Sequence, residues 1–170
     1  MTTLYNRRYL LLGGVGLAAV AIFRWPQPAS AVTPGKFEVT KTDEEWRKQL
    51  TKQQFDVLRK HGTEYPGSSA HNREKRKGTF ACVGCDLPLF SSETKYESHT
   101  GWPSFWQPLD NAIGTTVDKS LLMTRTEVHC RRCGGHLGHV FEDGPKPTGL
   151  RYCMNGVALK FTPAEGAGPA

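Results

Sequence analysis

The fold of this chain is decided by two short stretches, Phe80-Ala81-Cys82-Val83-Gly84-Cys85-Asp86 and His129-Cys130-Arg131-Arg132-Cys133-Gly134. Each stretch contains a Cys-x-x-Cys pair, and two such pairs together form a tetrahedral thiolate cage for zinc. Cysteines this close in sequence usually bind a metal or act in redox chemistry, and two pairs together favour the metal. We therefore expect one structural zinc ion, closed to substrate, held by Cys82, Cys85, Cys130 and Cys133.

Cys153 is the remaining one of the five cysteines and lies outside both pairs, in Leu150-Arg151-Tyr152-Cys153-Met154-Asn155. A single thiol outside a closed metal site, with histidines nearby in the sequence, is a candidate nucleophile. If this stretch is a strand, Arg151 and Asn155 point to the same face as Cys153. A guanidinium beside a thiol lowers the pKa of that thiol. The alternative is a buried core cysteine that packs as a small hydrophobe.

Two histidines, His136 and His139, follow the second cysteine pair. In a regular strand their spacing of three places them on opposite faces, whereas a turn around Gly134, Gly135 and Gly138 lets them converge. One of them is then a candidate general acid for an oxygen that leaves during thiolate attack. The alternatives are zinc ligation, which four cysteines make unnecessary, and a hydrogen-bonded core histidine.

Trp102 belongs to a dense aromatic turn, Gly101-Trp102-Pro103-Ser104-Phe105-Trp106. A tryptophan held on a loop by glycine and proline can form the wall of a small apolar pocket. The alternative is a side chain that only fills the core.

The rest of the pattern predicts two short helices packed on an antiparallel β domain. Capping boxes at Thr42 to Glu45 and at Thr51 to Gln54 mark the helix starts, and the second helix is predicted to end near His61. Beyond residue 78, short runs of β-forming residues alternate with Gly, Pro and Asp turns. Candidate strands cover residues 79–83, 88–90, 115–118, 121–129, 136–141, 150–154 and 158–161.

Residues 1–31 are predicted to be a signal peptide. Arg7 and Arg8 precede an apolar run over 10–23, which is shorter than the roughly 20 residues of a membrane-spanning helix. The run is followed by the small-residue site Ala29-Ser30-Ala31, which is typical of signal cleavage. The paired arginines resemble the twin-arginine class of bacterial export signals. We expect export to the periplasm without stable membrane insertion after cleavage, and the alternative is an uncleaved membrane anchor.

The predicted mature chain carries little net charge. Of the 22 Lys and Arg, three (Arg7, Arg8 and Arg24) leave with the signal, so 19 remain against 16 Asp and Glu and the net charge falls from +6 to +3. Such a balance does not indicate a nucleic-acid partner. The mature length suits one domain, and we divide it into a leader (32–41), a domain (42–162) and a disordered tail (163–170).

Together these motifs resemble one family, the methionine sulfoxide reductases of the B type (MsrB), which act on the R epimer of the sulfoxide. The motifs run in the family's order from about residue 42 to residue 161 and comprise Cys82-x-x-Cys85, Gly101-Trp102-Pro103-Ser104-Phe105, Cys130-x-x-Cys133, Gly135-His136-Leu137-Gly138-His139-Val140-Phe141, Asp143-Gly144-Pro145 and Arg151-Tyr152-Cys153-Met154-Asn155. The resemblance implies a mainly β fold of two antiparallel sheets with short N-terminal helices and a structural zinc.

The resemblance also implies a role for most residues singled out above. Cys153 is the nucleophile that attacks the sulfoxide sulfur and becomes a sulfenic acid. Trp102 packs on the S-methyl group, and Phe141 also contacts the substrate. Arg151 helps to tune the nucleophile.

Three further residues are implied to surround the sulfoxide oxygen, namely His136, His139 and Asn155. They polarise the oxygen and supply its proton, and His139 is the expected proton donor.

Thr100 marks a departure from the common family pattern. Many members carry a resolving cysteine just before the Gly-Trp-Pro motif, where this chain has Thr100. With the other cysteines assigned to zinc, we expect a one-cysteine enzyme, whose sulfenic acid is reduced by an external thiol or a thioredoxin-like protein. The expected substrates are oxidised proteins or peptides that contain methionine-R-sulfoxide, and we expect a monomer.

Two other functions fit part of the pattern. A zinc-ribbon-like binding module explains the four paired cysteines and gives Cys153, the histidines and Trp102 no role. A general thiol–disulfide oxidoreductase needs a Cys-x-x-Cys pair that is free of metal.

Overall fold

The computed structural model describes residues 37–120 and 123–166. Helices α1 (Asp43–Gln49) and α2 (Lys52–Lys60) come first, and 3₁₀ turns lie at Ala70–Asn72, Ser92–Thr94 and Gly156–Ala158. The strands are β1 (Gly78–Cys82), β2 (Pro88–Ser91), β3 (Lys95–Tyr96), β4 (Ser104–Phe105), β5 (Ile113–Asp118), β6 (Arg125–Cys130), β7 (His136–Phe141), β8 (Arg151–Met154) and β9 (Leu159–Pro163). The predicted signal peptide lies outside the described residues. Within 37–120 and 123–166, no helix has the length and apolarity needed to cross a membrane.

Both helices begin with the predicted capping boxes. The side chain of Thr42 accepts from the backbone N–H of Glu45, whose carboxylate accepts from the backbone N–H of Thr42. Thr51 and Gln54 repeat this arrangement at the start of α2. Helix α2 ends at His61, which adopts the left-handed conformation (φ 55°) common at helix C-termini. The helix then packs against β7 and the 3₁₀ turn at Gly156–Ala158.

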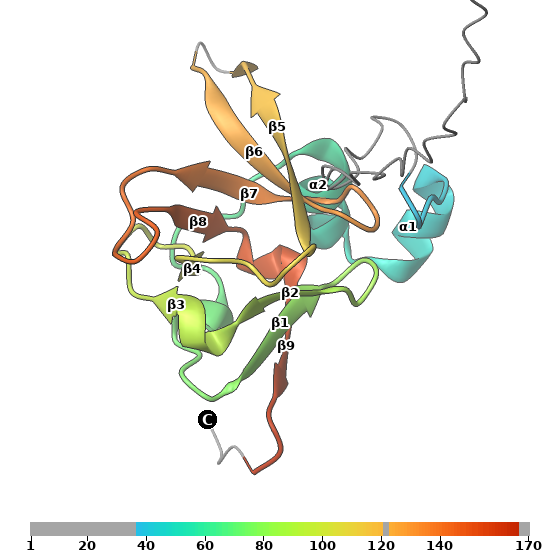
Figure 1. The fold of residues 1–170 in the computed structure, drawn as a ribbon. Helices are drawn as coiled ribbons and strands as arrows, with labels where there is room; N and C mark the ends of the chain where they lie inside the picture. The colour runs from blue at the N-terminus through green and yellow to red at the C-terminus, as the bar shows by residue number, and fades with distance from the viewer. Residues whose placement is uncertain (1–36, 121–122, 167–170) are drawn as a thin grey trace, which may run out of the picture. The chain divides into compact units, whose positions relative to one another are not determined.

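The strands form two antiparallel sheets (Figure 1), which confirms the predicted fold class. The smaller sheet has the order β2-β1-β9, and the larger has the order β3-β4-β8-β7-β6-β5. In the larger sheet the β5–β6 hairpin extends away from the other strands (Figure 1). The site residues singled out on β7 and β8 therefore lie in the middle of the larger sheet.

A cluster of aromatic rings fills the space between the sheets. Phe80 on β1 and Phe90 on β2 come from the smaller sheet, and Phe105 on β4 comes from the larger one; all three are fully buried. The rings of Phe90 and Phe105 stack with centroids 4.4 Å apart, and Phe80 meets Phe105 edge-on at 5.1 Å. Such pairs stabilise a core beyond the area that they bury, so this cluster fixes β4, and with it β8, against the smaller sheet.

Gly138 allows β7 and β8 to approach each other closely. A Cβ atom at this position would lie 2.1 Å from the carbonyl oxygen of Cys153, a distance that no side chain tolerates. The β6–β7 ladder also shifts register between Val128 and His129, because a bulge interrupts the pairing. A regular two-residue alternation therefore does not hold along the first half of β7.

The observed boundaries differ from the predicted ones in several places. Strands β3 and β4 have only two residues each, too few for a recognisable alternation, and were not predicted. The strand predicted over 121–129 begins at Arg125. At the C-terminal end β9 includes Pro163, and the backbone N–H of Ala164 donates to the carbonyl of Lys77. In the predicted leader, the N–H of Val39 donates to the carbonyl of Arg132.

Candidate active site

Four cysteines gather where the two sheets meet. Cys82 ends β1 and Cys130 ends β6, while Cys85 and Cys133 lie in the tight turns that follow these strands. All four Sγ atoms lie within 4.8 Å of one another. The sulfur pairs Cys82–Cys133 and Cys85–Cys130 are 3.7 and 3.5 Å apart. A tetrahedral ion with bonds of about 2.3 Å requires sulfur separations of about 3.8 Å, so the four thiols fit such an ion.

The four thiols also share their protons unevenly. Hydrogen bonds with neighbouring thiols lower the pKa of Cys85 and Cys130 and raise the pKa of Cys82 and Cys133. Because the four sulfurs lie so close together, the protonation of each one depends on the others. A metal ion replaces the protons of the thiols when it binds. The predicted cage is therefore assembled as the sequence indicated.

Cys153 lies on β8 and faces a separate cavity of about 170 Å³. Strand pairing places it opposite His139 on β7 and opposite Ser104 on β4. The residues that line the cavity are Thr63, Trp102, Arg125, Gly138, His139, Phe141, Cys153 and Asn155. Five of these, the thiol included, are among the residues that the sequence analysis assigned to the site.

The thiol of Cys153 is partly buried, and this burial raises its pKa above the ordinary value. A hydrogen bond from Thr100, whose Oγ1 lies 3.9 Å from the sulfur, and the charge of Arg151 act in the opposite direction. Arg151 thus lowers the pKa as expected, but the net pKa of this thiol is raised, because the cost of removing a thiolate from water exceeds the favourable contacts with Thr100, Arg151 and Ser104.

His139 is held by a carboxylate from the neighbouring hairpin. Its Nε2 lies 2.8 Å from Oδ2 of Asp118, and the same oxygen accepts from Arg125 at 2.7 Å. Burial lowers the pKa of His139 in spite of the hydrogen bond to Asp118. Hydrogen bonds from the backbone N–H and the side chain of Ser120, from His139 and from Arg125 lower the pKa of Asp118. At neutral pH the pair is therefore a neutral imidazole that is oriented by an ionised carboxylate.

His136 does not line the Cys153 cavity. Its Nδ1 lies 2.7 Å from Oε1 of Glu127, and its ring stands edge-on to the ring of His139 with centroids 5.4 Å apart. The bulge in β7 thus brings the two histidines together, as the glycine-rich sequence allowed, but only His139 reaches the cavity. The proton-supplying role that the resemblance implies for His136 stays a prediction.

Asn155 lines the cavity with its polar atoms already paired. Its Oδ1 accepts from the backbone N–H of Glu64, and its Nδ2 donates to the carbonyl of Leu137. The carbonyl of Glu64 also accepts from the indole N–H of Trp102 at 3.2 Å. Asn155 therefore fixes the loop that supports Trp102, which is a positioning contact that the sequence did not reveal.

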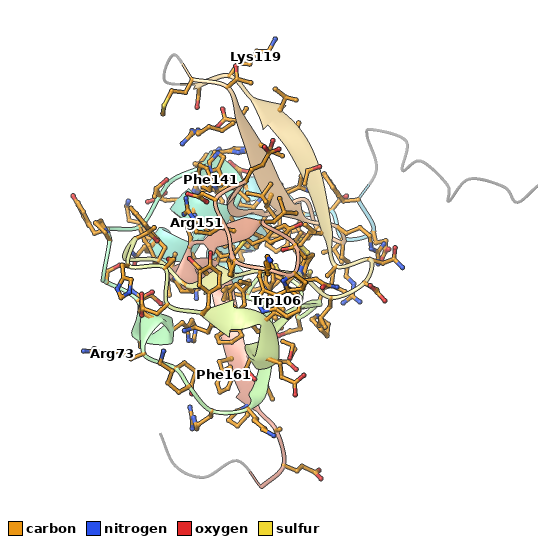
Figure 2. The ribbon with its side chains drawn as sticks, turned by 60° about the vertical axis from the view of Figure 1, so that its left-hand side comes forward. Arg73, Trp106, Lys119, Phe141, Arg151 and Phe161 are labelled. Carbon is orange, nitrogen blue, oxygen red and sulfur yellow. The ribbon has the colours of Figure 1, made fainter. Side chains whose placement is uncertain are left out.

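Arg151 lies on the rim of the site rather than in the cavity. It makes two hydrogen bonds to the carboxylate of Asp143, at 2.8 and 2.7 Å, and its guanidinium lies over the ring of Phe141 at 4.4 Å. Figure 2 shows Phe141 and Arg151 close together, as expected for partners in the pairing of β7 with β8. Arg151 therefore acts on Cys153 through its charge and holds the cavity wall formed by Phe141.

Comparison with known proteins gives the family. A family model described as the SelR domain matches residues 50–163. A protein of Leptospira interrogans named peptide methionine sulfoxide reductase MsrB is 54% identical over 126 residues, which cover 74% of this chain and 96% of the relative. Proteins of the same name from Pseudomonas putida (strain W619) and Methanosarcina barkeri are 55% identical over 131 residues (76% of this chain, 98% of the relative) and 52% identical over 128 residues (75% and 90%).

The chain belongs to the MsrB family. This result confirms the identification made from the sequence motifs, and it makes the protein an oxidoreductase. The MsrB domain here combines a four-cysteine cage that can hold a metal ion with a separate thiol cavity. The MsrB assignment does not by itself fix the role of each cavity residue, and these roles stay predictions.

Sequence reasoning missed the residues that hold the MsrB site in shape. Glu64, Asp118 and Glu127 bind Trp102 or the two histidines, and Thr63 and Arg125 complete the cavity lining. These residues come from a loop and from the β5–β6 hairpin, so no local spacing links them to Cys153. The pairing of β6 with β7, which sets Glu127 opposite His139, is seen in the structure and not in any local sequence pattern.

The raised pKa of Cys153 predicts how fast this thiol is alkylated. On the metal-loaded protein, the rate of reaction of Cys153 with iodoacetamide should rise with pH through a midpoint above the ordinary value of 9.0, because only the thiolate reacts. Arg151→Gln should move the midpoint further upward, since the positive charge of Arg151 favours the thiolate. Mass spectrometry of the Cys153 peptide gives the rate, and a midpoint below 9.0 in the unchanged protein would contradict this account.

Proposed function

We propose that the protein reduces methionine-R-sulfoxide, mainly in proteins and peptides, by attack of Cys153 on the sulfoxide sulfur. The observation that carries the proposal is the cavity in which this thiol lies opposite His139 and beside two aromatic walls, Trp102 and Phe141. At about 170 Å³ the cavity is smaller than the sites that hold drug-sized ligands. A methyl sulfoxide at the end of a peptide side chain is a group of suitable size, because only that end must enter.

The proton needed by the departing oxygen comes from the cavity itself. Burial raises the pKa of Cys153 and lowers the pKa of His139, so at neutral pH the resting pair is a thiol and a neutral imidazole. As the sulfur of Cys153 attacks, its proton passes to His139, and His139 then donates it to the sulfoxide oxygen. Asp118 stabilises the imidazolium that forms in between, because its carboxylate stays ionised.

The reaction transfers one oxygen and two electrons. The sulfoxide oxygen ends on Cys153, which becomes a sulfenic acid, and methionine leaves with an ordinary thioether sulfur. Two equivalents of an external thiol, or one dithiol protein, then restore the thiol of Cys153 with release of water and formation of their own disulfide. We propose a thioredoxin-like protein or a small thiol as this reductant, because the other four cysteines are gathered in the cage.

One experiment tests the activity and its nucleophile together. With dithiothreitol as reductant, the protein should reduce a peptide that contains R-methionine sulfoxide and leave the S epimer unchanged, and Cys153→Ser should abolish turnover. Chromatography of the peptide measures both. Equal turnover of the S epimer, or activity in Cys153→Ser, would sink the proposal. No turnover by a folded, metal-loaded protein would favour the zinc-ribbon-like binding module.

Another prediction concerns Thr100, which occupies the position where many family members carry a cysteine that resolves the sulfenic acid. In the unchanged protein, one turnover without reductant should leave a sulfenic acid that dimedone traps. In Thr100→Cys the new thiol takes the place of an oxygen that lies 3.9 Å from the sulfur of Cys153, so the same turnover should give an intramolecular disulfide. Mass spectrometry distinguishes the two products.

The control for this experiment is Thr116→Cys, which adds an exposed thiol on β5. That variant should give the dimedone adduct, as the unchanged protein does. An intramolecular disulfide to Cys153 in the unchanged protein would show that a cage cysteine resolves the intermediate and would contradict the one-cysteine mechanism.

We also propose that the ion held by the four cysteines is zinc. Four thiolates that leave no open position favour zinc and give it a structural role. The purified protein should contain one zinc per chain. Cys85→Ser should lower both the zinc content and the melting temperature, the latter by at least about 5–10 °C, whereas Cys153→Ser should change neither. Metal analysis and thermal unfolding give the two quantities, and full zinc occupancy in Cys85→Ser would contradict the assignment.

Finally, we propose that residues 1–31 direct export and are then removed, on the support of Arg7-Arg8 and Ala29-Ser30-Ala31. The amino-terminal sequence of the exported protein would then begin at Val32. An exported protein that still begins at Met1 would support the membrane anchor instead.

A further inference from the structure

A second cluster of metal-ligating side chains lies outside the four-cysteine cage. It consists of His61, at the end of α2, Glu127 on β6 and His136 at the start of β7. One nitrogen from each histidine and one oxygen of Glu127 all lie within 4.8 Å of one another. We call these three side chains the His61 cluster. The cage uses none of these side chains, none of them lines the Cys153 cavity, and the proton transfer proposed above passes through His139.

Both histidines of the cluster contact the same oxygen. Oε1 of Glu127 lies 3.0 Å from Nδ1 of His61 and 2.7 Å from Nδ1 of His136. Around a tetrahedral ion with bonds of about 2.0–2.1 Å to nitrogen and oxygen, neighbouring ligand atoms stand about 3.3 Å apart. The oxygen of Glu127 therefore needs to separate from the two nitrogens by about 0.3 and 0.6 Å to share an ion with them. The centroids of the two imidazole rings lie 5.2 Å apart.

The cluster leads from solvent into the protein. The side chain of His61 is 64% exposed, that of Glu127 is 13% exposed and that of His136 is 3% exposed. All three line a cavity of about 510 Å³ that also contains Asp118 and His139. An ion can thus enter from the His61 side and still be held by two largely buried ligands, which is the entry path that a metal site requires.

The other charged groups in this cavity are already paired or lie on the hairpin. Asp118 binds Arg125 and His139, so it is not free to serve the cluster as a fourth ligand. Lys119 contributes a positive charge near the turn of the β5–β6 hairpin (Figure 2). The cluster provides less negative charge than the cage, because it has one carboxylate and two neutral imidazoles where the cage has four thiolates. Its ion should therefore bind more weakly than the ion of the cage.

We propose that His61, Glu127 and His136 form a second metal site, which takes a divalent transition metal such as Zn²⁺, Co²⁺ or Ni²⁺. Two imidazoles and one carboxylate are a donor set that suits these ions. Three protein ligands leave at least one coordination position for water. Binding requires that the proton of each imidazole lies on Nε2 and not on Nδ1, so that Nδ1 presents its lone pair to the ion. Both rings then stay neutral, and the two Nδ1–H hydrogen bonds to Glu127 are replaced by bonds to the ion. The site is a neighbour of the Cys153 cavity, with which it shares Thr63, Arg125 and His139.

The experiment uses the full chain with zinc in its cage and with Cys153→Ser, so that the catalytic thiol cannot bind the probe ion. Equilibrium dialysis against Co²⁺, followed by metal analysis, should show one cobalt in addition to the cage zinc. The visible spectrum should show d–d bands without the thiolate charge-transfer absorption that exchange into the cage would produce. Thermal unfolding should shift upward with Co²⁺ concentration, because the ion binds the folded state.

Two variants test the ligands, and one serves as their control. His61→Asn removes an imidazole but keeps a residue that tolerates the left-handed backbone (φ 55°) at the end of α2. Glu127→Gln removes the shared charge at constant shape. Each should weaken cobalt binding at least about tenfold and remove the thermal shift. His99→Asn deletes another exposed histidine of left-handed conformation (φ 58°) and should bind cobalt normally.

The alternative is that the two histidines only donate hydrogen bonds to Glu127. In that case the protein binds no cobalt in addition to the cage zinc even at millimolar concentration, or it binds cobalt with equal affinity in the presence and absence of His61. Either result, or cobalt bound with thiolate charge-transfer absorption, would overturn the proposal. Because these experiments use no sulfoxide, their outcome is independent of the reductase activity.

Discussion

The close pairing of β7 with β8 is the constraint on which the site depends. It sets His139 directly opposite Cys153, so that the groups that would exchange a proton face each other across one ladder. This pairing needs glycine at position 138, where any Cβ would strike the carbonyl of Cys153. The pairing also requires that β8 is held in place. Strand β4 pairs with β8, and Phe105 on β4 packs into the aromatic cluster between the sheets. The reactive geometry therefore rests on backbone packing more than on contacts between the reacting side chains.

Burial has opposite effects on the two reacting groups, and both effects favour their neutral forms. It raises the pKa of Cys153 and lowers the pKa of His139, since a low-dielectric setting disfavours either charge. The nearby charges of Arg151 and Asp118 oppose these shifts without reversing them. A resting thiol is less open to oxidation than a thiolate, so the cavity holds a nucleophile that becomes reactive when its proton can leave for a substrate oxygen.

Local sequence patterns predicted the parts of this protein that depend on neighbours in the chain. The capping boxes at Thr42 and Thr51 were predicted correctly because their partners lie three residues away. The four-cysteine cage was also predicted correctly from the two cysteine pairs, since the spacing within each pair is set by the geometry of binding to one ion. The strands β3 and β4 were missed because two residues carry no alternation. Asp118 and Glu127 were missed because they reach the histidines only through the strand pairing of β5, β6 and β7, which no local pattern encodes.

Glu64 shows how the walls of the cavity keep their shape. This residue is only 5% exposed, and its carboxylate accepts from the backbone N–H groups of Gly156 and Val157 at 2.6 and 3.0 Å. These charge-assisted bonds compensate for the removal of the carboxylate from water. The backbone of the same residue binds Asn155 on one side and the indole of Trp102 on the other. Glu64 thereby connects Trp102 to the turn that follows β8. These contacts fix the position of the Trp102 side chain relative to the strand that bears Cys153.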